Sequence, residues 1–199
     1  MTRTIDLAER LRFYRIDDAT RAALAEAWPI VETHLPAVLD AFYAHVGAVP
    51  ALAAMVGRQK PRLAAAQATH WRRLFSGTFD ADYLASTRAI ADAHVRIGLE
   101  PGWYIGGYAF VAERLGEVLG RAHRFGGRRT ASLIGAVGKV VMLDMDLALT
   151  VYHDTQIRLA DQRRDAMREA VRDFETRAVA TIATVAAAGG ELRATAAGL

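Results

Sequence analysis

The spacing of apolar residues is helical along almost the whole chain, and this feature constrains the fold more than any other. Apolar side chains recur three and four residues apart, and Ala and Leu dominate. No sustained alternation of apolar and polar residues indicates a β-strand. Glycine, proline and short polar groups divide the pattern into separate segments. The sequence therefore predicts an all-α domain.

Prolines and glycines locate the expected helices. A short first helix is predicted over about 4–12, and a second over about 19–33 that Pro29 would kink. Pro36 suits the first turn of a third helix. Further helices are expected over about 62–75, 82–98 and 101–125, and from 127 to nearly the end of the chain.

Composition excludes several classes of function. The 199 residues carry a net charge of only +3, and the arginines are interspersed with acidic residues, so nucleic-acid binding is not predicted. The absence of cysteine excludes disulfides, thiolate nucleophiles and Cys-ligated clusters. The N-terminus lacks the apolar core of a signal peptide. The most apolar stretch, 131–152, contains Lys139, Asp144 and Asp146, which argues against a membrane span. We expect a soluble, cytoplasmic protein.

The tail from Phe174 onward is rich in Ala and Thr. A heptad-like seam of mostly small residues runs through it and the preceding turn. Its members are Val171, Phe174, Ala178, Thr181, Val185, Ala188 and Leu192. The seam is compatible with a coiled coil, and equally with a final amphipathic helix that packs on its own domain.

His94 is the candidate site residue that stands out. Three- and four-residue steps place it on one helical face with Leu84, Thr87 and Ala91, and Ile97 flanks it. A lone histidine in such a setting is usually a core residue. No second histidine or glutamate follows at metal-ligand spacing, so a zinc or di-iron site is not expected. A single axial histidine does suit haem, because the porphyrin supplies the other four donors.

Three segments carry a resemblance to a known family. "HVRIGLEPGWYIGGY" (94–108) resembles the proximal segment of the globin-coupled sensors, the haem globins of aerotaxis transducers and related gas sensors. "LDAFYAHV" (39–46) is similar to their distal B helix, and "RLAAAQATHWRRLFSG" (62–77) to their E helix. The resemblance implies a globin fold with an extra N-terminal helix over 1–155. It also implies a helical linker over 156–199 that begins a chemotaxis-type signalling helix.

The same resemblance implies roles for individual residues. His94 would be the axial ligand of haem b iron, with its other ring nitrogen held by an acceptor. Tyr43 would donate a hydrogen bond to O₂. Ala66 stands where some relatives carry a threonine, so a second distal hydroxyl is missing. The other residues expected at the cofactor are Phe42, Leu63, Ile97, Trp103 and Tyr104.

The implied function is a haem-based sensor of O₂ or another diatomic gas, in chemotaxis and not in catalysis. We expect a homodimer through helices at about 101–125 and 130–153, because the second is more apolar than one globin core needs. A downstream signalling domain would lie outside this chain. Two alternatives stay open: a haem enzyme that turns over NO or peroxide, and a cofactor-free helical interaction module.

Overall fold

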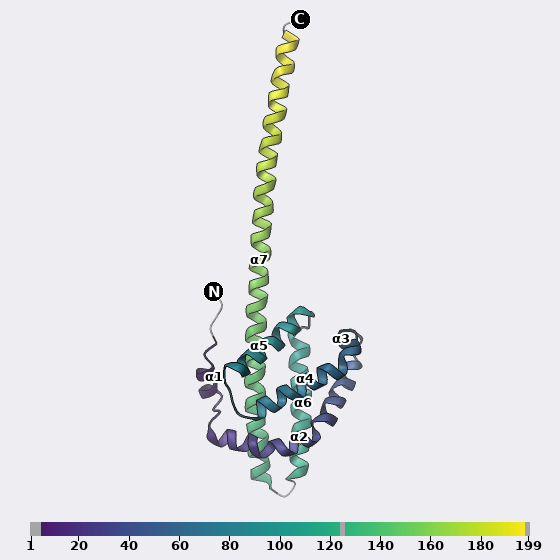
Figure 1. Ribbon diagram of the computed structural model, residues 1–199, viewed down its shortest axis with the longest axis vertical. Helices are drawn as coiled ribbons and strands as arrows, with labels where there is room; N and C mark the ends of the chain where they lie inside the picture. Colours follow the sequence, from purple (N-terminus) through teal and green to yellow (C-terminus); the bar gives the residue numbers. More distant parts are fainter. Residues whose placement is uncertain (1–4, 124–125, 198–199) are drawn as a thin grey trace. The chain divides into compact units, whose positions relative to one another are not determined.

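The computed structural model describes residues 5–123 and 126–197, and among them it contains helices and no β-strand (Figure 1). None of the described helices is long and apolar enough to cross a membrane. The chain divides into two compact units, Met1–Thr155 and Gln156–Leu199. In order, the elements are α1 (Leu7–Phe13), α2 (Asp18–Gly47), α3 (Pro50–Val56), the 3-10 turn η1 (Gly57–Gln59), α4 (Lys60–Phe75), α5 (Ala81–Arg96), α6 (Pro101–Ala122) and α7 (Gly127–Ala197).

Aspartates fix the start of three helices. Asp6, Asp17 and Asp80 each have an extended backbone, and each carboxylate accepts a hydrogen bond from the amide three residues later, at 2.8–2.9 Å. Such a cap satisfies an amide that the helix itself cannot pair, which stabilises a helix by about 1 kcal/mol. The first turns of α1, α2 and α5 therefore follow from local sequence.

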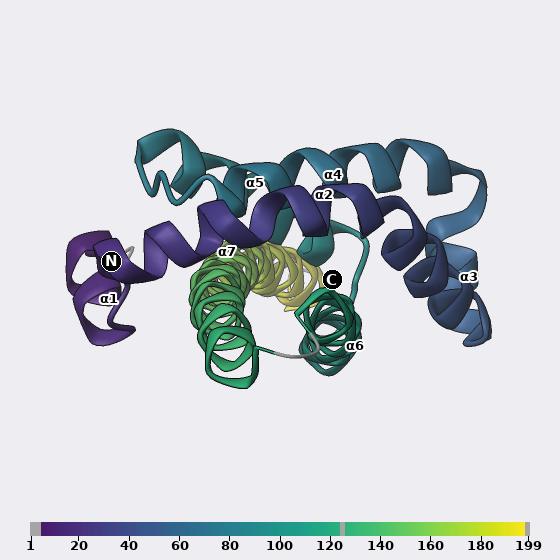
Figure 2. The ribbon, with the colours of Figure 1, turned by 90° about the horizontal axis from the view of Figure 1, so that it is seen from below.

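The prediction that Pro36 begins a new helix is wrong. α2 continues through both Pro29 and Pro36, and it changes direction along its length (Figure 2). A proline inside a helix removes one backbone hydrogen bond and bends the helix, but it does not forbid continuation. Here a buried apolar stripe runs past both prolines and outweighs that loss. Its members are Leu24, Ala27, Val31, Leu35, Val38 and Leu39.

The core of the first unit lies where α2 crosses α6 and the first part of α7 (Figure 2). Gly107 permits a close crossing of α2 and α6, because a side chain there would meet the Phe42 ring at 3.3 Å. Most apolar side chains in the first part of α7 are buried in this core, which accounts for much of the excess seen in the sequence. They are Leu133, Val137, Val140, Val141, Leu143 and Leu147.

Candidate functional site

The backbone of His94 is held by the cap that ends α5. Gly98 has φ +73°, a left-handed conformation that glycine adopts without strain. The Leu99 amide donates to the His94 carbonyl, and the Gly98 amide to the Val95 carbonyl, both at 3.0 Å. These two bonds form a Schellman motif, with His94 at its first carbonyl. The "HVRIGL" segment therefore fixes this histidine at the end of its helix.

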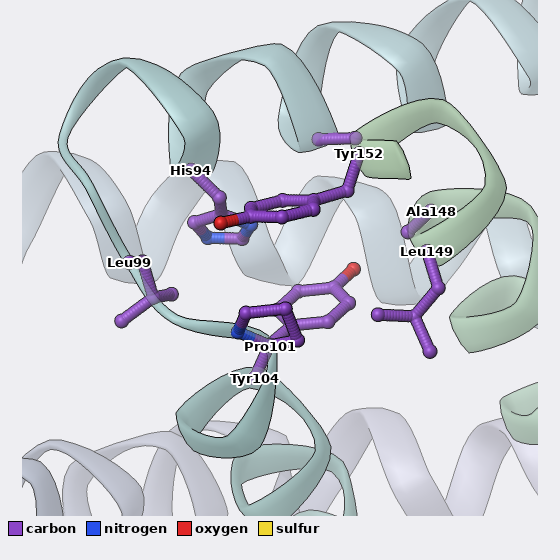
Figure 3. A pocket seen from close by; sticks show the side chains of 8 residues that line it. His94, Leu99, Pro101, Tyr104, Ala148, Leu149 and Tyr152 are labelled. Carbon is purple, nitrogen blue, oxygen red and sulfur yellow. The ribbon is translucent and has the colours of Figure 1, made fainter. Parts of the chain in front are cut away.

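The His94 side chain points into a pocket between α5, α6 and α7 (Figure 3). The Tyr104 ring lies 4.8 Å from the imidazole, measured between centroids. The free space in the pocket is only about 10 Å³, room for roughly one water molecule, so a larger ring requires its side chains to move apart. Its lining is Ala91, His94, Leu99, Pro101, Tyr104, Ala148, Leu149 and Tyr152.

The charge and hydrogen bonding of the His94 imidazole leave the ring free to bind a ligand. Burial lowers its pKa to about 4, so the ring is neutral at pH 7. Nδ1 is buried and has no hydrogen-bond partner among the described residues. The expectation that an acceptor holds the second ring nitrogen is therefore not met in this structure. A neutral imidazole with a buried, unpaired nitrogen is costly unless a ligand compensates for it.

Tyr43 forms a second polar point, on α2. Its side chain is 8% exposed, and burial raises the pKa of its hydroxyl to about 12, so it stays protonated. The hydroxyl makes no hydrogen bond with any residue that the structure describes. Phe42 lies edge-on to the Tyr43 ring at 5.2 Å, and Phe110 packs against Phe42 at 6.2 Å. Tyr43 and Phe42 thus lie in one aromatic cluster, and the Tyr43 hydroxyl remains available as a hydrogen-bond donor.

The other residues expected at the cofactor differ in burial. Leu63 is half-buried on α4, whereas Ala66 is exposed. Ile97 is 50% exposed and Trp103 46% exposed, and neither lines the His94 pocket. Of the proximal residues proposed from sequence, only Tyr104 lies beside His94.

One polar residue on the inward side of α4 is Gln67, which the sequence analysis did not single out. It is half-buried, and its Oε1 is buried without a partner among the described residues. Gln67 is one full turn beyond Leu63, so both lie on the same helical face. The four-residue step from Leu63 was the available signal; the three-residue step leads instead to the exposed Ala66.

The largest polar cluster in the first unit was also missed. Asp144 on α7 is 1% exposed, and its carboxylate accepts four hydrogen bonds. Oδ1 accepts from Tyr83 at 2.6 Å and from Thr87 at 3.2 Å. Oδ2 accepts from His70 Nε2 at 2.8 Å and from the Tyr108 hydroxyl. All the acceptor positions of the carboxylate are used.

This cluster explains how a carboxylate survives in an apolar core. Burial alone would raise the pKa of Asp144, but electrostatic attraction to His70, together with the hydrogen bonds from His70, Tyr108 and Tyr83, keeps it below its usual value. The pKa of Tyr83 is raised by burial and by the Asp144 charge, so that phenol remains a donor. The partners come from α4, α5 and α6. Asp144 therefore ties three helices to α7.

The chain is similar to known proteins in sequence and in fold. The family model Protoglobin matches residues 5–158. The heme-based aerotactic transducer HemAT of Halobacterium salinarum is 27% identical over 180 residues, which are 82% of this chain and 36% of that protein. The chain thus spans about a third of the length of this curated relative.

Among solved structures, the globin domain of a Geobacter sulfurreducens globin-coupled sensor superposes with a TM-score of 0.69 at 21% identity. The match covers 75% of this chain and 99% of that domain. At this identity the likeness establishes the fold, and it confirms the expected all-α globin fold. Together the matches confirm the resemblance to globin-coupled sensors that 39–46 and 94–108 indicated.

Proposed function

Because the chain belongs to the Protoglobin family, we propose that its first unit binds haem and senses O₂ or another diatomic gas. The observation that carries the proposal is the His94 imidazole, neutral, buried at Nδ1 and unpaired, at the fixed end of α5. The name of the matched aerotactic transducer includes a haem, and the proposal extends that cofactor to this chain.

The residues at the pocket fit a haem. A neutral imidazole offers a lone pair to an iron that already has four donors from its macrocycle. The rest of the lining is largely apolar, which suits a porphyrin face, and the Tyr104 ring packs on the imidazole. We propose iron protoporphyrin IX, haem b, as the cofactor and His94 as its axial ligand. Phe42, Leu63, Ala66, Ile97 and Trp103 remain predicted contacts.

Bound haem would supply a ferrous iron that gives electron density to a diatomic gas. The protein's contribution on the gas side is Tyr43. Its phenol stays protonated, and its O–H has no partner among the described residues. A gas that gains negative charge can accept a hydrogen bond from this hydroxyl, and such a bond typically contributes about 1 kcal/mol. O₂ gains more charge than CO, so Tyr43 would favour O₂.

We propose that the chain acts as a sensor input and not as an enzyme, with chemotaxis as the output. In the second unit several large apolar side chains of α7 are exposed. They are Met167, Val171, Phe174, Val179, Ile182 and Val185. Three of these six, Val171, Phe174 and Val185, belong to the heptad-like seam, which supports pairing with another helix over the amphipathic alternative. A signalling domain beyond this chain would complete the output.

The proposed dimer face lies on α6 and the first part of α7. Ile105, Ile134 and Met142 are 40–42% exposed there. Gly102, Gly106, Gly135 and Gly138 share these helices, and a side chain at any of them would meet nothing within 4 Å. Each interior glycine costs a helix about 1 kcal/mol relative to alanine, and nothing within the described unit requires them. A second copy that approaches closely would account for them.

The dimer is tested by light scattering at micromolar protein. Met142→Glu should convert a dimer into a monomer with haem content unchanged, because the charge falls on an exposed apolar site. Arg58→Glu, an exposed change on η1, is the control and should leave the dimer intact. A wild-type monomer across the micromolar range would remove the dimer proposal.

The haem proposal is tested by the visible spectrum of purified His94→Ala after reconstitution with hemin. We expect loss of most bound haem, and partial recovery with added imidazole. His34→Ala is the matched control, since His34 is exposed on α2, and it should bind haem like the wild type. Full haem content and an unchanged ferrous spectrum in His94→Ala would refute the assignment. Steady turnover of NO or peroxide by the wild type would favour the enzyme alternative.

A further inference from the structure

We infer that Asp144 is a positioning residue that couples the His94 side of the site to the globin unit's last helix. The inference rests on the proposed haem function and deepens it. Asp144 does not touch His94. It acts through a chain of two tyrosines, while it also anchors α4 and α5 to α7.

The chain from Asp144 to His94 is continuous in the structure. The Tyr108 hydroxyl donates to Asp144 Oδ2, so its own oxygen must accept from the Tyr104 hydroxyl, 3.0 Å away. The Tyr104 and Tyr108 rings meet edge-on at 4.9 Å. The Tyr104 ring then lies 4.8 Å from the His94 imidazole. Each member thus contacts the next, from the carboxylate on α7 to the proposed ligand on α5.

The direction of these hydrogen bonds gives the chain its stiffness. Asp144 can only accept, which forces Tyr108 to donate to it and leaves Tyr104 to donate to Tyr108. Hydrogen bonds to a charged acceptor are stronger than those between neutral groups. A shift of Tyr104 therefore displaces the Tyr108 hydroxyl and the Asp144 carboxylate, because neither hydroxyl is free to rotate to another partner.

The same carboxylate also binds side chains of α4 and α5. Tyr83 and Thr87 bind Oδ1 from α5, and His70 binds Oδ2 from α4. Thr87 lies two turns before His94 on the same helical face. Through Oδ1, Asp144 binds the helix that carries His94, and through Oδ2 it binds Tyr108, which contacts Tyr104 beside His94. Contacts thus run from Asp144 to α5 by two routes, through Tyr108 and Tyr104 to His94 and directly to Thr87. A movement of His94 relative to its own helix therefore displaces Asp144, and with it α7.

The small size of the His94 pocket and its wall on α7 also support coupling between His94 and α7. Its free space of about 10 Å³ means that side chains next to His94 must shift when a ring enters, and Tyr104 is among them. Ala148 and Leu149, one turn beyond Asp144 on α7, line the same pocket. The helix that would receive the displacement is thus also a wall of the site.

The test compares Tyr108→Phe with the wild type and with Asp146→Asn. Tyr108→Phe removes only the link between Tyr104 and Asp144 and leaves the His70, Tyr83 and Thr87 bonds. Asp146 is the matched control, two residues from Asp144 on α7, where it pairs with Arg10 at 2.9 Å outside the cluster. Asp144→Asn is a second variant, which keeps the shape but loses the charge and replaces one accepting oxygen with a donor.

Three measurements are made on each protein: haem content, the iron–histidine stretching band of the ferrous state, and hydrogen exchange of 136–151 with and without CO. In Tyr108→Phe we expect normal haem content, a shifted iron–histidine band, and loss of most of the CO-dependent exchange difference. Asp144→Asn should show the same changes if it folds. Asp146→Asn should match the wild type in all three.

The outcomes separate the two proposals. If the wild type binds no haem, the proposed function falls and the coupling falls with it. If the wild type binds haem but shows no exchange difference, or if Tyr108→Phe retains both the difference and the wild-type band, the coupling alone is overturned. Loss of haem from Tyr108→Phe would also overturn it, because the residue would then be needed for binding and not for coupling.

Discussion

Asp144 and His94 are both polar residues in the core of the same unit, yet their hydrogen bonding is opposite. Every acceptor position of the Asp144 carboxylate is occupied, by donors from three other helices. The His94 Nδ1 atom is buried and has no partner among the described residues. Tyr43 is a buried residue whose hydroxyl makes no hydrogen bond within that part of the chain.

The contrast separates a structural role from a binding role. A buried polar group that is fully paired can hold helices together, because removing one partner leaves the others unsatisfied. A buried polar group without a partner weakens the fold, and a ligand that fills the missing contact removes the cost. Asp144 should therefore matter most to stability, and His94 and Tyr43 most to what binds.

Asp144→Ala should give the largest effect on stability. The change strands the donors of His70, Tyr83 and Tyr108 in the core, and breaking a buried charged cluster costs about 3–5 kcal/mol. Urea unfolding of the haem-free protein, followed by circular dichroism, measures the loss. Asp146→Ala is the control and should cost at most about 1 kcal/mol, because the Asp146–Arg10 pair is partly exposed. Equal losses in the two variants would contradict the contrast.

Tyr43→Phe should act on the gas and hardly on the fold. Loss of one hydrogen bond to O₂, about 1.4 kcal/mol, should speed O₂ dissociation about tenfold. CO dissociation should change less, and the free energy of unfolding should stay within about 0.5 kcal/mol, since the hydroxyl has no partner to lose. Stopped-flow ligand replacement measures both gases. Equal effects on O₂ and CO would argue against a hydrogen bond from Tyr43.

His94→Leu should improve the haem-free protein while it abolishes haem binding. Leucine fills similar space in an apolar pocket and removes an unpaired buried nitrogen, which should raise the free energy of unfolding by about 1 kcal/mol. Thermal unfolding of the haem-free variant and wild type measures this. A loss of stability instead would show that His94 is a packed core residue, as the simplest interpretation of its sequence allowed.

Local signals in the sequence predicted local features well. Prolines and glycines placed a break between the helices expected over about 82–98 and 101–125, close to the observed end of α5 at Arg96 and the start of α6 at Pro101. Pro36 misled because its local preference for a first turn was outweighed by a buried stripe that continues past it. Burial depends on residues far along the chain, which a local rule cannot weigh.

The Asp144 cluster could not be predicted for the same reason. Its partners His70 and Tyr108 lie 74 and 36 residues away in the sequence. In the sequence Asp144 only counted as a charge that argued against a membrane span. Which of several acidic residues on α7 turns inward is decided by helix packing. The roles of His94 and Tyr43 came from the family resemblance, and they remain predictions that the variants above test.

The smallest expected effect distinguishes two neighbours on α4. Ala66, where relatives offer a hydroxyl, is exposed, whereas Gln67 faces inward with a buried, unpaired Oε1. Gln67→Met keeps the volume and removes the amide, so it should raise the stability of the haem-free protein by up to about 1 kcal/mol. It should also alter O₂ dissociation by less than the tenfold of Tyr43→Phe, because Tyr43 stays in place. Ala66→Thr should change neither quantity, since its hydroxyl would meet solvent.

The same unfolding and stopped-flow measurements apply. A larger kinetic effect from Ala66→Thr than from Gln67→Met would place position 66, and not position 67, at the gas, and it would show that α4 turns when haem binds.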